Sequence, residues 1–261
     1  MKTFNCEPTL TDTQILEICR DGFKMLRGVV PEAINKQAFE FLDLHPHGTP
    51  VEILEEDWFV ENVILNAQAV GIVRSLLGKN FALPTRMANH RAEGPGPAQH
   101  WHRDGGSVYS PEMDSLQVFY YPQDTPLELG PTQVVPGSHL LFSLQSHMSH
   151  YGGIRVAHPT VAPAGSIFIT IYSIWHRRGP STARGTRNLL KYWYRRTVPP
   201  ERDWIIEPEF NLKQAYHFPH GLTFNREGHK TINDAAEIYF WLCGKHDQFR
   251  ARTNNLPAYF S

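Results

Sequence analysis

From Phe81 to Arg196 the chain consists of short β-prone runs that are separated by glycine and proline. Glycine and proline interrupt regular structure, and many short strands with such punctuation are typical of a closed sandwich or barrel. The pattern therefore predicts a mainly β fold. The runs expected to form strands are Ala88 to Arg91, Trp101 to Asp104, Leu116 to Tyr121, Gln133 to Val135, Ile167 to Trp175 and Asn188 to Arg196.

The segments on either side of this region have helical patterns. Thr11 or Thr13 is expected to cap a first helix that ends at Asp21-Gly22, followed by a short strand over Phe23 to Leu26. The other expected helices begin at Pro31, span Ala67 to Leu77, and follow a cap at Thr231-Ile232-Asn233. We predict one domain over residues 1–261, with a helical segment at 1–80, a β core at about 81–200, and a loop and helix at 201–261.

Composition excludes several classes of partner. The chain of 261 residues has 25 basic and 26 acidic residues, so no global charge excess favours nucleic acid or an anionic membrane. No apolar run is long enough to span a membrane, and the N-terminus lacks a signal core. The cysteines Cys6, Cys19 and Cys243 are odd in number and scattered, which favours a reducing compartment. We therefore expect a cytoplasmic protein; its oligomeric state is not predicted.

His102 and Asp104 are the most informative pair for chemistry. Residues two apart on a strand point to the same face, about 6.6 Å apart, so both side chains can reach one metal ion. Alone the pair is a weak signal, because 14 histidines make chance pairs common. His176 follows the apolar run Ile167 to Ile171, which makes it a candidate third ligand. Two histidines and one carboxylate form the facial triad of non-haem Fe(II) oxygenases. His100 shares the His102 face by alternation and is an alternative ligand or a pocket residue.

Arg187 lies eleven residues after His176, on what is expected to be the next antiparallel strand. A guanidinium near a metal suits a dicarboxylic co-substrate, because one carboxylate can chelate iron while the arginine binds the other through two parallel hydrogen bonds.

These motifs together resemble the phytanoyl-CoA dioxygenase family of Fe(II)/2-oxoglutarate-dependent oxygenases over nearly the whole chain. The resemblance is carried by Asp21-Gly22-Phe23, Leu76-Leu77-Gly78, Trp101-His102-Arg103-Asp104-Gly105, Gly130-Pro131-Thr132, Pro136-Gly137-Ser138-His139, His176 and Arg187. It implies a double-stranded β-helix (a cupin-like jelly-roll) with helices outside. It also implies Fe(II), O2 and 2-oxoglutarate, with Arg187, Thr132 and Gln99 binding 2-oxoglutarate. Strict alternation places Gln99 opposite His102, so this reading requires a local bulge.

The family reading predicts hydroxylation of a C–H bond of a small molecule, with release of succinate and CO2. Asp104 favours hydroxylation over halogenation, because a halogenase leaves the carboxylate position open for halide. The alternatives are a non-catalytic jelly-roll binding protein and a zinc hydrolase that uses the same ligands. The chain departs from the family at Arg177-Arg178, where many members have Gly and then Ser after the histidine. An anionic group on the substrate would suit Arg178, and His100 and Gln117 are further candidate substrate residues.

Overall fold

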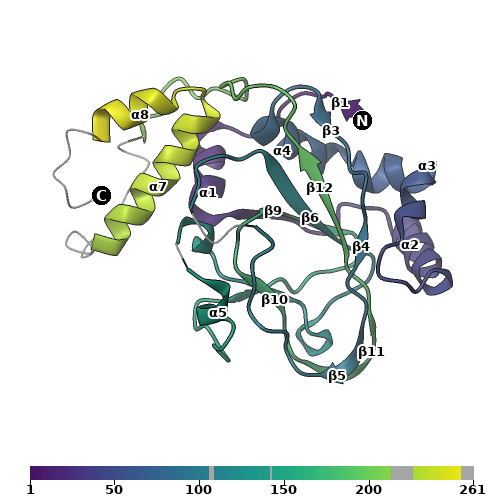
Figure 1. The fold of residues 1–261 in the computed structure, drawn as a ribbon. Helices are drawn as coiled ribbons and strands as arrows, with labels where there is room; N and C mark the ends of the chain where they lie inside the picture. The colour runs from purple at the N-terminus through teal and green to yellow at the C-terminus, as the bar shows by residue number, and fades with distance from the viewer. Residues whose placement is uncertain (106–108, 142, 213–225, 254–261) are drawn as a thin grey trace.

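The computed structural model describes residues 1–105, 109–141, 143–212 and 226–253 (Figure 1). A seven-stranded antiparallel sheet has the order β1-β3-β12-β6-β9-β2, and β4 also pairs with β12. Its strands are β1 (Thr3–Phe4), β2 (Phe23–Leu26), β3 (Phe81–Ala82), β4 (Ala88–Asn89), β6 (Ser115–Tyr121), β9 (Ser166–Ile171) and β12 (Leu190–Arg195). A three-stranded sheet has the order β10 (His176–Arg178), β7 (Thr132–Val134), β8 (His158–Pro159), and β5 (Ala92–Gly96) pairs with β11 (Ser181–Arg187).

The large sheet buries both of its faces, and the alternation of side chains separates them. Val118 and Tyr120 of β6 belong to the main core, whereas Phe119 and Tyr121 pack with Val134 of the small sheet. The interior between the two sheets is therefore lined by the odd-numbered residues of β6. The same parity places Leu189 and Lys191 on this inner side, because Lys191 pairs directly with Phe119.

Helices cover the outer face of the large sheet, and the last two described helices, near the C-terminal end, lie on the side of α1 (Figure 1). Thr11 caps α1 with a capping box, and Gly22, at φ 85°, ends it. The α-helices are α1 (Asp12–Asp21), α2 (Glu32–Leu44), α3 (Asp57–Phe59), α4 (Ala67–Leu77), α5 (Gln145–Met148), α7 (Arg226–Leu242) and α8 (His246–Thr253). Short 3-10 or π turns are η1 (Val51–Glu55), η2 (Val60–Ile64), η3 (Leu127–Leu129) and η4 (Ser138–Leu140). Among the described residues, no helix is long and apolar enough to cross a membrane.

The mainly β jelly-roll class with flanking helices is confirmed, but several predicted elements differ from those observed. The strand predicted from Ala88 to Arg91 ends at Asn89. Trp101 to Asp104 is not a strand, since only His102 pairs, through an isolated bridge to His176. The run from Ile167 to Trp175 ends at Ile171, where the chain turns and crosses to the small sheet. The last long helix begins at Arg226, so the cap predicted at Thr231 to Asn233 lies inside this helix and not at its start.

Candidate active site

Backbone pairing brings two of the three predicted metal ligands together. His102 and His176 exchange N–H···O=C hydrogen bonds of 3.0 Å in both directions, so their side chains leave neighbouring chain segments on the same side. The candidate ligand atoms of His102, Asp104 and His176 all lie within 4.8 Å of one another. Within the described parts of the chain, this is the only group of three such residues.

Both imidazoles are oriented by a carbonyl two residues earlier. Nδ1 of His102 lies 3.0 Å from the His100 carbonyl, and Nδ1 of His176 lies 3.1 Å from the Ile174 carbonyl. A neutral imidazole that donates from Nδ1 presents the lone pair of Nε2, which is the form that binds a metal. Burial and the neighbouring His176 lower the pKa of His102, which favours this neutral form. The donor set therefore fits a divalent metal such as iron.

Asp104 is held by side chains that the sequence reading did not assign to it. Its Oδ2 accepts a hydrogen bond from the Gln117 amide, lies 3.0 Å from Lys191 Nζ, and lies 3.4 Å from His176 Nε2. Thr170 Oγ1 lies 3.4 Å from Gln117 Oε1 and thereby orients the amide. Burial raises the pKa of the Asp104 carboxyl, but contacts with His176, Lys191 and Gln117 outweigh burial and hold its pKa well below the usual range. The carboxylate is therefore ionised and ready to bind a cation.

A cavity of about 260 Å³ adjoins the triad. Arg187 is 1% exposed on its wall, at the end of β11, and its Nη2 donates to Thr132 Oγ1 over 2.9 Å. Its buried Nε has no hydrogen-bond partner among the described residues. Burial lowers the pKa of Arg187 to about 10, with a contribution from the neighbouring Arg178. The cavity is lined by Asn89, His90, Arg91, Ala92, Gln99, His102, Phe119, Thr132, His176, Arg177, Arg178, Arg187 and Leu189.

Gln99 lines the cavity because the chain departs locally from strict alternation, as the predicted role of Gln99 required. The Gln99 N–H donates to the Arg178 carbonyl over 3.0 Å, and Gln99 Oε1 accepts from the Arg178 N–H over 3.1 Å. Between these bonds and the His102–His176 bridge, the segment from Gln99 to His102 advances three residues, whereas the facing segment from His176 to Arg178 advances two. The extra residue breaks the alternation, so Gln99 and His102 share the cavity.

Two candidate substrate residues, His100 and Gln117, do not line the cavity. His100 is exposed, its Nδ1 lies 3.2 Å from the Ser149 carbonyl, and it does not line the cavity. Arg177 stacks 4.4 Å above Trp101 and donates from Nε to Gln133, so its guanidinium has partners within the protein. Gln117, a candidate substrate residue, contacts Asp104 instead.

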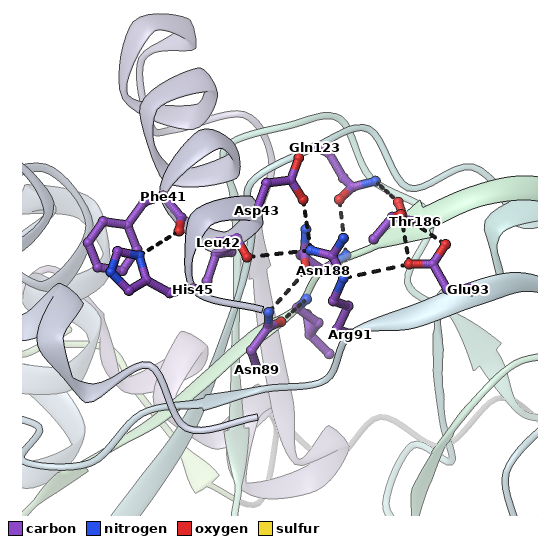
Figure 2. A network of polar contacts seen from close by, with 11 residues as sticks. Phe41, Leu42, Asp43, His45, Asn89, Arg91, Glu93, Gln123, Thr186 and Asn188 are labelled. Carbon is purple, nitrogen blue, oxygen red and sulfur yellow. Dashed lines mark hydrogen bonds and ion pairs between the residues drawn. The ribbon is translucent and has the colours of Figure 1, made fainter. Parts of the chain in front are cut away.

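His90 and Arg91 are cavity residues that the sequence reading missed. Burial, with Lys191 and Arg187 nearby, lowers the pKa of His90 to about 4, so its imidazole is neutral at pH 7. Arg91 is directed away toward the end of α2, where its Nη1 lies 2.8 Å from Asp43 (Figure 2). Its charge is compensated there, whereas no described carboxylate pairs with Arg178 or Arg187. Neither His90 nor Arg91 belongs to a spacing motif, so no sequence signal identifies them.

Solved structures with a related fold include two that hold a metal and 2-oxoglutarate. HygX from Streptomyces hygroscopicus, with nickel and 2-oxoglutarate bound, has a TM-score of 0.60 at 16% identity, covering 75% of this chain and 90% of its own. The epimerase SnoN, in complex with Fe3+, alpha ketoglutarate and nogalamycin RO, has a TM-score of 0.56 at 16% identity, covering 70% and 82%. EctD from S. alaskensis has a TM-score of 0.58 at 15% identity, covering 79% and 85%.

A search of curated proteins found no significant match. A family model does match: that of phytanoyl-CoA dioxygenase aligns with residues 18–189, which include the triad, Thr132 and Arg187. The chain therefore belongs to the phytanoyl-CoA dioxygenase family, and it is an enzyme of the iron- and 2-oxoglutarate-dependent oxygenase type.

Proposed function

We propose that this protein is an Fe(II)- and 2-oxoglutarate-dependent dioxygenase that hydroxylates a C–H bond of a small molecule and releases succinate and CO2. The observation that carries the proposal is that His102, Asp104 and His176 converge, and that the two histidines line one cavity together with Arg187. A cation-binding set thus lies beside a buried guanidinium whose Nε has no partner among the described residues. This pairing suits a dicarboxylate that chelates a metal at one end.

The residues divide the work between them. His102, Asp104 and His176 would hold the iron, which together with 2-oxoglutarate and O2 supplies the oxidising chemistry. Arg187, oriented by Thr132, binds the far carboxylate of 2-oxoglutarate.

Apolar side chains shield this interior. Phe119 packs against His176 with ring centroids 5.8 Å apart, and Leu189 is 2% exposed on the cavity wall. Both keep water from the co-substrate side of the site.

The two rival functions have less support. Zinc hydrolases commonly use a glutamate as general base beside the metal-bound water, and no Asp or Glu is among the described residues that line the cavity. A binding module has no need for three converging ligands together with a buried arginine. The related fold of SnoN belongs to an epimerase, so the fold by itself does not select hydroxylation. The Asp104 carboxylate argues against halogenation but not against epimerisation.

The primary substrate we propose is a small molecule with an anionic group. Arg178 lines the cavity and is half-buried, and no described carboxylate pairs with its guanidinium. A guanidinium in such a place binds carboxylates and phosphates well. Acids and their neutral amides, compared as substrates, test this choice.

Product analysis tests the reaction itself. The anaerobic protein is loaded with Fe(II) and 2-oxoglutarate, exposed to O2 with candidate substrates, and assayed for succinate and for an oxygen atom incorporated from labelled O2. We expect succinate and hydroxylated product in equal amounts. Succinate formation with a rearranged, non-oxygenated product would contradict hydroxylation while leaving the co-substrate assignment intact.

A further inference from the structure

Lys191 is a cation placed directly beside a candidate metal ligand. Its side chain lies on the inner face of β12 and is 9% exposed, and Nζ is 3.0 Å from Asp104 Oδ2. The ammonium also lies 5.6 Å from the centre of the Trp193 ring. Asp104 is its only ion-pair partner among the described residues. A lysine is not needed to orient the carboxylate, because Gln117 already donates to the same oxygen.

We propose that Lys191 is a positioning residue that sets the charge of the metal centre, weakening the binding of the metal alone and strengthening the binding of the dianionic co-substrate. This inference rests on the proposed function, since it concerns the same iron and 2-oxoglutarate. It assigns to Lys191 an effect on two binding steps with opposite signs.

The argument is one of charge in a buried place. Two neutral histidines, one carboxylate and a divalent ion carry a net charge of +1, and Lys191 raises this to +2. The ammonium repels the incoming cation and partly neutralises the carboxylate that must bind it. It would also attract the dianionic 2-oxoglutarate. Charges a few ångströms apart and shielded from water interact strongly, so each effect is expected to be roughly tenfold or more.

Gln117 supplies a matched control. It contacts the same oxygen of Asp104 as Lys191 does, and it is fully buried, but it carries no charge. Loss of its hydrogen bond loosens the carboxylate without changing the charge of the site. A purely structural role for Lys191 predicts that Lys191 and Gln117 variants behave alike.

The experiment measures two affinities in each folded variant. Mn(II) is titrated into the metal-free protein and free Mn(II) is followed by electron paramagnetic resonance; 2-oxoglutarate is then titrated into the Mn(II)-loaded protein by calorimetry. The variants are Lys191→Gln, which keeps a donor without the charge, Lys191→Met, Lys191→Arg and the control Gln117→Met. Circular dichroism checks the fold of each.

We expect Lys191→Gln and Lys191→Met to bind Mn(II) roughly tenfold more tightly and 2-oxoglutarate roughly tenfold more weakly. Lys191→Arg keeps the wild-type values within about threefold, because it keeps the charge. Gln117→Met binds Mn(II) more weakly and changes 2-oxoglutarate affinity little. The inference is overturned if Lys191→Gln weakens both affinities, changes neither, or matches Gln117→Met. Wild-type protein that binds no Mn(II) at all would instead contradict the proposed function.

Discussion

At the scale of single residues, Arg187 shows most directly what the interior is built to bind. A guanidinium that is 1% exposed, and that contacts the neutral side chains of Thr132 and Tyr121 without a paired carboxylate among the described residues, is costly to bury. Burial lowers its pKa only to about 10, so it remains charged at pH 7. A carboxylate bound beside the guanidinium would offset this cost.

Replacing Arg187 should therefore abolish most of the co-substrate affinity. For Arg187→Ala we expect a loss of about 3 kcal/mol, roughly a hundredfold in the dissociation constant for 2-oxoglutarate. Arg187→Lys should recover only part of it, because one ammonium cannot reproduce two parallel hydrogen bonds. Calorimetric titration of the Mn(II)-loaded variants measures this, and equal affinity in wild type and Arg187→Ala would refute the assignment.

Spacing, together with the family resemblance for Thr132, predicted residues that the structure brings close together, but it missed others around them. His102, Asp104, His176, Thr132 and Arg187 are found together as the motifs indicated. His100 illustrates the limit, because alternation placed it beside His102, and the segment is not a strand. Lys191 and His90 were missed for a related reason. Their place depends on the register of β12 with β6 and β4, which no local pattern encodes.

At the scale of elements, caps were easier to predict than strand ends. Thr11 caps the start of α1, and Gly22 and Gly78 end α1 and α4, as the sequence predicted, because capping depends on local residues. The end of β9 was not predicted, because Tyr172 to Trp175 remain apolar enough to read as strand. Their turn toward β10 is set by pairing across the small sheet, which is a long-range interaction.

The turn at Gly130 is a sensitive element because it leads into β7, which carries Thr132. Gly130 has φ 67°, and an added Cβ would lie 2.6 Å from the Gly179 carbonyl oxygen. We expect Gly130→Ala to lower the free energy of unfolding by about 2 kcal/mol or more, measured by urea denaturation. Gly152→Ala is the matched control, since nothing lies within 4 Å of its added Cβ and its φ is not positive. A change no larger than that of the control would show that the turn tolerates a side chain.

At the scale of the whole molecule, Asp12 links the N-terminal helix α1 to the segment that follows the β core and to α7. This fully buried residue begins α1 and accepts hydrogen bonds from the side chains of Arg202, Trp204 and Tyr239 and from the Glu207 N–H. Burial opposes ionisation, but these bonds outweigh it and lower the pKa of Asp12 to about 2. The helix α7, through Tyr239, is thereby tied to the N-terminal segment.

This network predicts a specific loss of stability in acid. The folded-state pKa of Asp12 lies below the unfolded value of about 3.9, so its contribution is complete above that pH and is lost as pH falls toward 2. The difference between the two pKa values corresponds to about 2.6 kcal/mol. Urea denaturation between pH 6 and pH 3, run in about half-unit steps, should show a shallower pH dependence for Asp12→Asn than for wild type. Parallel pH profiles of the free energy of unfolding for the two proteins would show that Asp12 does not cause the loss of stability in acid.

The central claim is that His102, Asp104 and His176 bind one metal ion, and anaerobic titration with Fe(II) tests it most directly. Wild-type protein should bind one ion per chain, and His176→Ala should lose this binding while remaining folded. The matched control is His100→Ala, which removes an exposed histidine outside the cavity and should bind iron as wild type does. Unchanged stoichiometry in His176→Ala, or loss of iron in His100→Ala, would contradict the assignment of the metal centre.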